Sequence, residues 1–404
     1  MRTSSGGIPR YRPFAGPALL QQGFRPFFLG AGIWSATALA LWLGGLVGAV
    51  GLPNSLDWPV WHGHEMVFGF AGAAVAGFLL TAIPNWTGRL PLQGAPLAVL
   101  MSSWVAGRAA MLGADLIGPL ATAVLDLTFL ILLLLAVTRE IIAGRNWRNL
   151  PMAGALTTFT AANLLVHLEA IAVADTAAAG LRLGVATSLM LISLVGGRII
   201  PSFTRNWLVK RGETRLPASS GPVDKAALLV CGAALAAWVA DIGHWTTGIL
   251  LLAAATIGAV RLARWRGHLT AREPLLWVLH LGHGWLVVGL ALLGIGQIRP
   301  IVPETAGLHA LTAGAIGTMI LGVMTRASLG HTGRALSAGP ATTAIYVLVT
   351  LAAVLRIAAT FAEMRYLAIL VISAVVWIGA FLLFVAVYAP LLSTSRSPRE
   401  ITTS

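Results

Sequence analysis

Six of the nine histidines lie inside or at the edge of long apolar stretches, and these are the residues of the sequence best suited to chemistry: His62, His64, His167, His280, His283 and His309. An ionisable side chain in apolar surroundings costs free energy unless it is paired. The ordinary explanation for one such histidine is a hydrogen bond to a neighbouring helix. The alternative is a metal site, because imidazole is a favoured ligand of copper, zinc and haem iron. Several histidines at one depth favour the metal site.

The first group of histidines is expected near the outer face, at the external ends of three predicted helices. His62 and His64 lie in the run WHGHEM, His167 is followed two residues later by Glu169, and His309 opens a helix from the same side. Four imidazoles at similar depth, with the carboxylates of Glu65 and Glu169 nearby, can ligate a transition metal. The residue pattern therefore predicts an outer metal cluster.

The second group is the pair His280 and His283, expected in the inner half of the bundle. A spacing of three places both on one face of a helix. Imidazoles at that depth suit axial ligation of a haem, or one axial ligand with a distal hydrogen-bond donor. Three arginines near the inner face are candidate partners of haem propionates, with snorkelling to lipid phosphate as the plain alternative: Arg25, Arg198 and Arg326.

Buried carboxylates are candidates for proton transfer. Asp126 is expected near the middle of a helix, where an ion pair with Arg108 is one explanation and a proton path is the other. Glu65 and Glu169 are the further candidate proton carriers, at the outer cluster.

The composition shows which elements must position these side chains. The chain has 404 residues, of which 57% are hydrophobic and only 10% charged, with a mean hydropathy of +0.84. Soluble domains carry roughly 25% charged residues. The single cysteine, Cys231, excludes a disulfide scaffold. The long uninterrupted apolar runs indicate an all-α polytopic bundle in contact with the lipid bilayer rather than a β-barrel.

Runs long enough to span a bilayer predict about twelve helices. The expected spans are 27–49, 62–83, 95–112, 116–138, 151–173, 181–199, 223–240, 245–262, 274–295, 305–326, 340–360 and 365–389. We divide the chain into an N-terminal tail (1–23), a twelve-helix membrane domain (24–390) and a C-terminal tail (391–404).

The net charge of +13 is explained by topology. Alternating the loops places all but five of the 27 Lys and Arg residues on one side; the exceptions are Arg108, Arg182, Arg299, Arg356 and Arg365. Basic residues collect in cytoplasmic loops. The asymmetry predicts that both termini are cytoplasmic, and it gives no reason to expect nucleic-acid binding.

A faint internal repeat accompanies the histidines. Aligning His64 with His309 also aligns Gly69, Gly72 and Gly77 with Gly314, Gly317 and Gly322. The two helices are either related by duplication or both need small residues for close packing.

Several motifs resemble the NnrS family of bacterial membrane proteins. They are Gly23–Phe28 (GFRPFF), Trp61–Phe70 (WHGHEMVFGF), Phe78–Gly88 (FLLTAIPNWTG), Gly196–Trp207 (GGRIIPSFTRNW), His280–Trp285 (HLGHGW) and the run from His309 to Arg334. The resemblance covers roughly residues 22–389. Gly63 stands where the family pattern leads us to expect alanine.

The resemblance implies a multi-pass protein of the bacterial inner membrane with twelve helices, haem b and copper. It also implies a role in nitric oxide metabolism or resistance to nitrosative stress, often beside denitrification. It assigns no ligands; those given above come from depth and spacing.

The expected function is therefore to bind, detoxify or reduce nitric oxide at a histidine-ligated metal. A reductase also needs electrons, and the chain has no Cys-x-x-Cys-His motif for covalent haem, so the donor is expected to be quinol or a separate redox protein. One alternative is a twelve-helix secondary transporter of a metal or small anion. A weaker one is an assembly factor that passes haem or copper onward.

Overall fold

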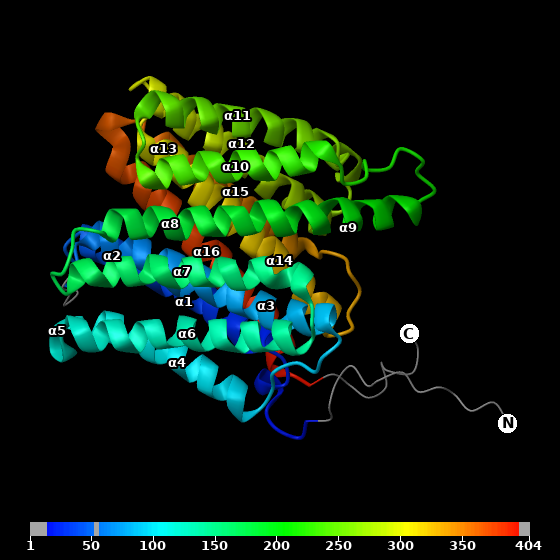
Figure 1. Ribbon diagram of the computed structural model, residues 1–404, viewed down its shortest axis with the longest axis horizontal. Helices are drawn as coiled ribbons and strands as arrows, with labels where there is room; N and C mark the ends of the chain where they lie inside the picture. Colours follow the sequence, from blue (N-terminus) through cyan, green and yellow to red (C-terminus); the bar gives the residue numbers. More distant parts are fainter. Residues whose placement is uncertain (1–13, 52–55, 396–404) are drawn as a thin grey trace.

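The computed structural model describes residues 14–51 and 56–395 of the chain. All regular secondary structure in these residues is helical, and the long helices pack side by side with nearly parallel axes (Figure 1). The predicted tail boundaries at 23 and 391 stay predictions, since most of both tails lies outside the described residues.

The bundle is built from these helices: α1 Phe24–Leu46, α2 Trp58–His64, α3 Gly72–Thr87, α4 Ala95–Leu112, α5 Ala114–Ile117, α6 Pro119–Ala143, α7 Leu150–Ala170, α8 Ala177–Leu191, α9 Gly197–Val209, α10 Pro222–Ala240, α11 His244–Ala263, α12 Pro274–Ile298, α13 Glu304–His309, α14 Thr318–His331, α15 Pro340–Ala359 and α16 Tyr366–Ser393. Glycine followed by proline begins α6, α10 and α15. Proline suits the first helical turn because its missing N–H is one that the turn leaves unpaired.

Among the described residues, eleven helical segments are long and apolar enough to cross a membrane. The difference from the predicted twelve is α7. This helix has 21 residues and packs between α6 and α8, but polar residues such as Asn163, His167 and Glu169 lower its hydropathy. The prediction of an all-α polytopic membrane bundle is confirmed, and each of the twelve predicted ranges coincides with a helix. The helix α7 is less apolar than the other long helices because it carries part of the polar site.

Three of the long helices are interrupted by a π-helical segment. Glu65–Ala71 (η2) joins α2 to α3, Ile192–Gly196 (η4) joins α8 to α9, and Ala310–Gly317 (η6) joins α13 to α14. The first and third follow directly on His64 and His309, the two histidines that the repeat aligns. Counted with α7 as a span, the interrupted helices are the second, sixth and tenth.

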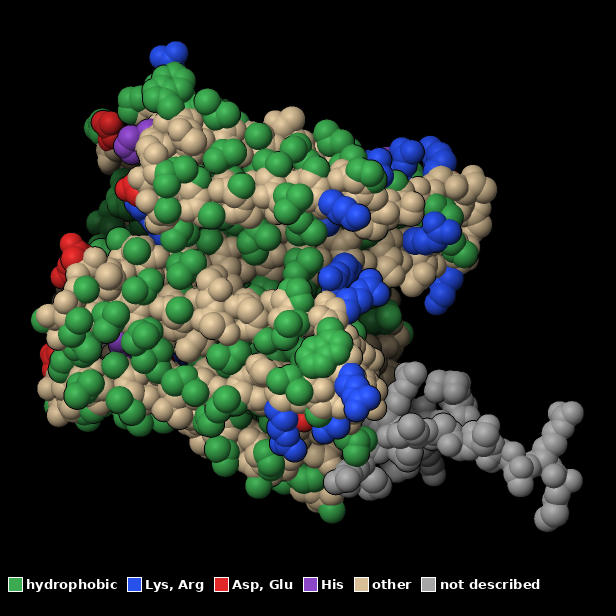
Figure 2. All heavy atoms as spheres, viewed as in Figure 1, with side chains coloured by type: hydrophobic (Ala, Val, Ile, Leu, Met, Phe, Trp, Pro, Cys, Tyr) green, Lys and Arg blue, Asp and Glu red, His purple; other side chains and the backbone are tan. Residues whose placement is uncertain are grey.

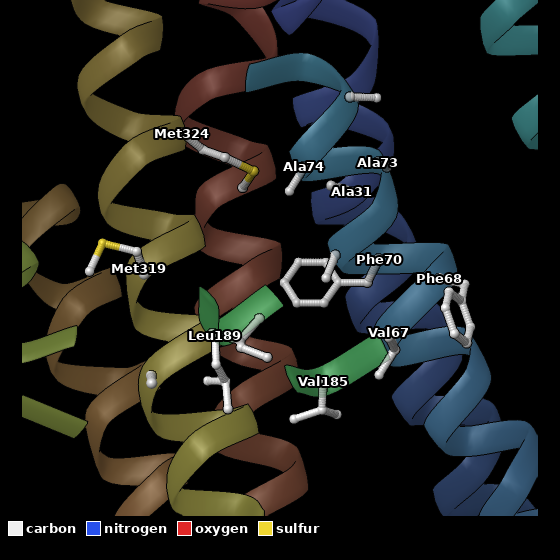
Figure 3. Close-up of a cluster of buried hydrophobic side chains, with 14 of the residues drawn as sticks. Ala31, Val67, Phe68, Phe70, Ala73, Ala74, Val185, Leu189, Met319 and Met324 are labelled. Atoms are coloured by element: carbon white, nitrogen blue, oxygen red, sulfur yellow. The ribbon is translucent and has the colours of Figure 1, made fainter. Parts of the chain in front are cut away.

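The three interrupted helices meet in the middle of the bundle. Figure 3 shows Phe70 of η2, Leu189 of α8 and Met324 of α14 converging on one buried cluster. Beside this cluster lies an apolar pocket of about 90 Å³, partly open to the surface of the bundle and lined by residues of all three helices, among them Ala71 and Met319. The regions with irregular backbone therefore lie against one another, buried in protein, which is where a membrane protein tolerates them.

Charge is distributed unevenly over the ends of the bundle. Lys and Arg side chains gather at the end where α9 finishes, and acidic side chains gather at the opposite end (Figure 2). This distribution is the one that the positive-inside rule requires of a cytoplasmic face. It supports cytoplasmic termini, an orientation that stays a prediction.

Arg25 ties the first helix to the last. Its Nη1 atom donates to the carbonyl oxygens of Leu392 at 2.9 Å and Thr394 at 2.8 Å, at the end of α16. The side chain is buried. A helix C-terminus leaves its last carbonyls unpaired and carries partial negative charge. A guanidinium there donates hydrogen bonds to the carbonyls and balances the partial charge. The geometry gives Arg25 a structural role that the sequence did not indicate.

We expect Arg25→Gln to destabilise the bundle by on the order of 2 kcal/mol, because charged hydrogen bonds to buried carbonyls are lost. The change is measured as a lower unfolding temperature in detergent. Arg198→Gln is the control, since Arg198 is exposed in α9, and its unfolding temperature should stay at the wild-type value. If Arg25→Gln instead released haem from an equally stable protein, the role of Arg25 would be in cofactor binding.

Candidate metal centre

Two histidines and one carboxylate meet inside the bundle. His64 ends α2, Asp126 lies in α6 and His167 in α7, and one ligand atom from each lies within 4.8 Å of the others. All three side chains are at most 1% exposed. Residues separated by 103 positions in the chain thus form one group with the composition of a metal site.

His64 is held through both ring nitrogens. Its Nδ1 lies 2.9 Å from Glu65 Oε1, and its Nε2 lies 2.7 Å from Asn163 Oδ1 and 3.1 Å from Asp126 Oδ2. Asn163 is oriented by its own Nδ2, which donates to Asp126 Oδ2 at 2.6 Å. Each ring nitrogen of His64 therefore faces an acceptor, the arrangement that an imidazolium requires.

Arg108 joins the two carboxylates. One of its nitrogens donates to both oxygens of Glu65 at 2.6 Å, and the other donates to Asp126 Oδ1. Asp126 Oδ2 also accepts from His167 Nε2 at 2.9 Å, and Trp34 Nε1 donates to Glu65 Oε2 at 2.7 Å. The expected ion pair of Asp126 with Arg108 is present, within a larger network.

The network has a charge balance that bears on metal binding. With neutral histidines, one arginine and two carboxylates leave a net charge of −1. A buried group of this kind needs compensation, since an uncompensated charge in low dielectric is costly. A proton or a bound cation supplies it. Metal binding and protonation are therefore alternatives at this site, as is general for histidine ligands.

The donor set fits a transition metal. Two imidazoles and a carboxylate suit copper, zinc or iron, and three protein ligands leave a further position open. Glu65 accepts from Nδ1 of His64, which leaves Nε2 for a metal. A carboxylate that orients a ligating imidazole is a common feature of metal sites. The residues present thus fit the copper that the resemblance implies.

The π segment shapes this site. Glu65 is the first residue of η2, and Gly69 lies one turn later, against the charged groups. A Cβ at Gly69 would lie 2.7 Å from Trp34 Nε1, 2.8 Å from Arg108 Nη1 and 2.9 Å from Glu65 Oε2. Only glycine leaves room there for the arginine and tryptophan to reach the carboxylate.

The predicted outer cluster of four histidines divides into two sets. His62 lies two residues before His64, which places their side chains on opposite sides of α2. The described contacts pair His62 with Trp42, whose ring centroid lies 4.6 Å away, and place His309 beside Thr305. Glu169 accepts from the backbone N–H of Ala177 at 2.7 Å and so fixes the start of α8. Neither histidine nor Glu169 joins the buried group of described residues.

His280 and His283 form a third location, on α12. His280 Nε2 lies 2.9 Å from Thr204 Oγ1, and the Trp265 ring packs on His283 with centroids 4.6 Å apart. Both side chains are buried, and the Nδ1 atoms of both lack hydrogen-bond partners in the described part of the chain. The pair lies on one helix face, as the spacing predicted.

The remaining predicted arginines lie near the basic end. Arg326 places its guanidinium 4.1 Å from the centroid of the Phe203 ring, a cation–π contact. Arg198 is exposed, as expected for a side chain that snorkels to lipid phosphate. Their haem-propionate role stays a prediction.

Asn163 and Trp34 are members of the network that the sequence did not indicate. Asn163 precedes His167 by four residues and therefore shares its helix face, a signal present in the sequence. Trp34 gives no such signal, because a tryptophan in a membrane helix is common in any role.

We expect Gly69→Ala to destabilise the protein by about 1–3 kcal/mol, since the new methyl group displaces Arg108 or Trp34 from Glu65. Gly154→Ala in α7 is the matched control, because a Cβ there meets nothing within 4 Å. Unfolding temperatures in detergent measure both. An equal effect of the two substitutions would mean that the packing around Glu65 is less tight than described.

Comparisons with known proteins agree with the motifs. The model of the NnrS protein family matches residues 18–396, nearly the whole chain. A comparison with curated proteins gives no match. The matched region includes the buried network, both other histidine pairs and all the long helices. With so complete a match, the chain belongs to the NnrS family.

Proposed function

We propose that this protein binds copper at His64, Asp126 and His167, and that nitric oxide binds to or is reduced at this centre. The observation that carries the proposal is the buried group itself: two imidazoles and a carboxylate with ligand atoms within 4.8 Å of one another, each side chain at most 1% exposed. Membership of the NnrS family supports a nitric-oxide-related membrane protein. We place it in the bacterial inner membrane with both termini cytoplasmic.

The surroundings suit a small apolar ligand. Nitric oxide reaches a buried site through lipid, and the apolar pocket of about 90 Å³, which is partly open to the surface of the bundle, offers it an apolar space. Ala71 lines this pocket at the end of η2, the segment whose first residue, Glu65, orients His64. One short segment thus borders both the pocket and the metal centre.

The chain's own residues have defined parts in this proposal. Bound copper would supply a one-electron redox centre with an open coordination position. Glu65 orients His64 and, with Asp126, holds or moves a proton at the ring nitrogens that they face. Arg108 donates hydrogen bonds to both carboxylates and balances part of their charge. Reduction of nitric oxide needs electrons from outside the chain, which we assign to quinol or a separate redox protein.

Haem b is the second cofactor of the proposal. His280 and His283 fit it only in part, because axial ligands bind opposite faces of a haem, whereas these two imidazoles project from one face of α12. Trp265 also fills the space against His283. This pair can supply at most one axial ligand.

We expect the purified full-length protein to contain about one copper per chain, and His64→Ala or His167→Ala to lose it. Glu65→Gln should weaken copper binding about 10–100-fold, as is usual when the partner of a ligating histidine is removed. Metal analysis measures the content, and the electron paramagnetic resonance spectrum with and without nitric oxide measures ligand binding. His244→Ala is the control, since His244 is exposed and bonds Gln297.

Two outcomes contradict the proposal. Copper retained by both single variants would place the metal elsewhere. A wild-type protein without copper, which moves a metal or small anion into vesicles along an ion gradient, would make it a secondary transporter.

A further inference from the structure

A partly open pocket of about 560 Å³ lies between the ends of α3 and α6, and it has no part in the proposed function. The last turns of both helices line it, together with residues 88–93, which lead to α4. Both helices belong to segments that are apolar enough to cross a membrane. They end at the side of the bundle where α9 finishes and where Lys and Arg side chains gather (Figures 1 and 2).

The lining of this pocket is apolar at depth and charged near the helix ends. Leu79 and Val137 are buried apolar residues of the lining. Leu79 lies eight residues before the end of α3, which places it about 12 Å deeper along the helix axis. The charged lining residues are all near the helix ends: Arg89, Arg139 and Glu140. A ligand that matches the pocket therefore has an apolar part and a polar end.

Glu140 brings two arginines together at the charged end of the pocket. Its Oε2 atom accepts from Nε of Arg89 at 2.5 Å, and its Oε1 atom lies 4.0 Å from Nε of Arg139. The terminal nitrogens of both guanidinium groups make no hydrogen bond to the described residues, and the two side chains are 38% and 74% exposed. Two arginines and one carboxylate leave a net charge of +1. The charged end thus offers free donors and a positive charge to an anion.

Contacts outside the pocket fix its walls. Nδ2 of Asn146, in the turn that follows α6, donates to the carbonyl oxygen of Trp86 near the end of α3 at 2.5 Å. The backbone N–H of Gly94 donates to the carbonyl oxygen of Leu20 at 2.9 Å and so fixes the end of the segment 88–93. The pocket is therefore formed before a ligand arrives, and binding does not have to order its walls.

We propose that this pocket binds one anionic phospholipid, whose phosphate lies between Arg89 and Arg139. The acyl chain then lies along Leu79 and Val137. Arginine binds phosphate through charge-assisted hydrogen bonds, and basic pockets between membrane helices on the cytoplasmic side bind the head groups of anionic lipids. A free phosphate would leave the apolar lining uncovered, and an uncharged lipid would leave the positive charge uncompensated. An anionic amphiphile meets both conditions.

The lipid would join the two helices that lead to the carboxylates of the buried network. α3 continues from η2, whose first residue is Glu65, and α6 carries Asp126. Asp126 lies fourteen residues before Glu140, or about 21 Å along α6. At that distance the lipid makes no contact with the network and acts by holding α3 against α6. The inference is therefore independent of copper and of nitric oxide.

The first test titrates the purified full-length protein in detergent with phosphatidylglycerol and counts bound lipids by native mass spectrometry. We expect one site of higher affinity than all others. Arg89→Ala and Arg139→Ala should each weaken it about fivefold, and Ala136→Leu should weaken it by filling part of the pocket. The control is the double variant Arg205→Ala, Arg211→Ala, which removes exposed charges outside the pocket and should keep the wild-type affinity.

Titrations with phosphatidylcholine and with glycerol phosphate separate the possible ligands, and both should bind at least about tenfold more weakly. Equal affinity for phosphatidylcholine would make the pocket a site for any lipid, and tight binding of glycerol phosphate would make it a site for a soluble phosphate compound. Either result overturns the proposal, as does an equal loss of affinity in the control variant. If Arg89→Ala does not fold, Arg139→Ala and Ala136→Leu keep the pair of Arg89 with Glu140, and unchanged affinity in both contradicts the site.

The second test changes the charge at the same end of the pocket. Glu140→Gln keeps an oxygen that accepts from Arg89 but removes the negative charge, so phosphatidylglycerol should bind about fivefold more tightly. The lipid should also raise the unfolding temperature of this variant more than that of Arg139→Ala. Glu213→Gln is the matched control, since it removes the carboxylate that pairs with Arg215 outside the pocket and should leave the affinity unchanged. Affinity that does not rise in Glu140→Gln would mean that charge does not select the ligand.

Discussion

The buried ion network around Arg108 is the interaction on which the rest of the structure depends. A guanidinium and two carboxylates in a membrane bundle are stable only if each is paired, because breaking a buried pair leaves an uncompensated charge. Three different helices supply this pairing, because Arg108 donates hydrogen bonds to both Glu65 and Asp126. The third, fourth and fifth spans must therefore pack around the second, and α7 can be less apolar than the other spans because its polar residues face this network.

The π segments are the second constraint. A π-helical insertion shifts the faces of a helix, and such segments are frequent at functional sites. Here η2 carries Glu65 towards Arg108 and Trp34, with Gly69 giving the clearance, while η6 follows directly on His309. Both interruptions thus follow directly on a histidine, and the three interrupted helices pack against one another at the centre (Figure 3). The irregular backbone segments and the apolar pocket share one region of the protein.

The sequence correctly indicated that the histidines lie inside otherwise apolar helices. It grouped them only by their expected depth along the helices. Depth follows from position along a helix, at 1.5 Å per residue. Direction around the axis also follows from the sequence, so the opposite facing of His62 and His64 could have been inferred. What could not be inferred is which neighbour each one meets, since helices that are apolar on all sides give no pattern to show which faces touch.

By itself, the sequence determined the class of protein, the position of every long helix and the uneven distribution of charge between the two ends, because these follow from local hydropathy and from the cost of burying charge in lipid. Only the tertiary structure decided that Asp126 and Asn163 join His64 and His167, that Arg108 bridges Glu65 and Asp126, and that Arg25 caps the last helix. Each of these contacts joins residues from different helices. Their formation depends on the rotation and order of the helices in the bundle, which packing and charge pairing fix together.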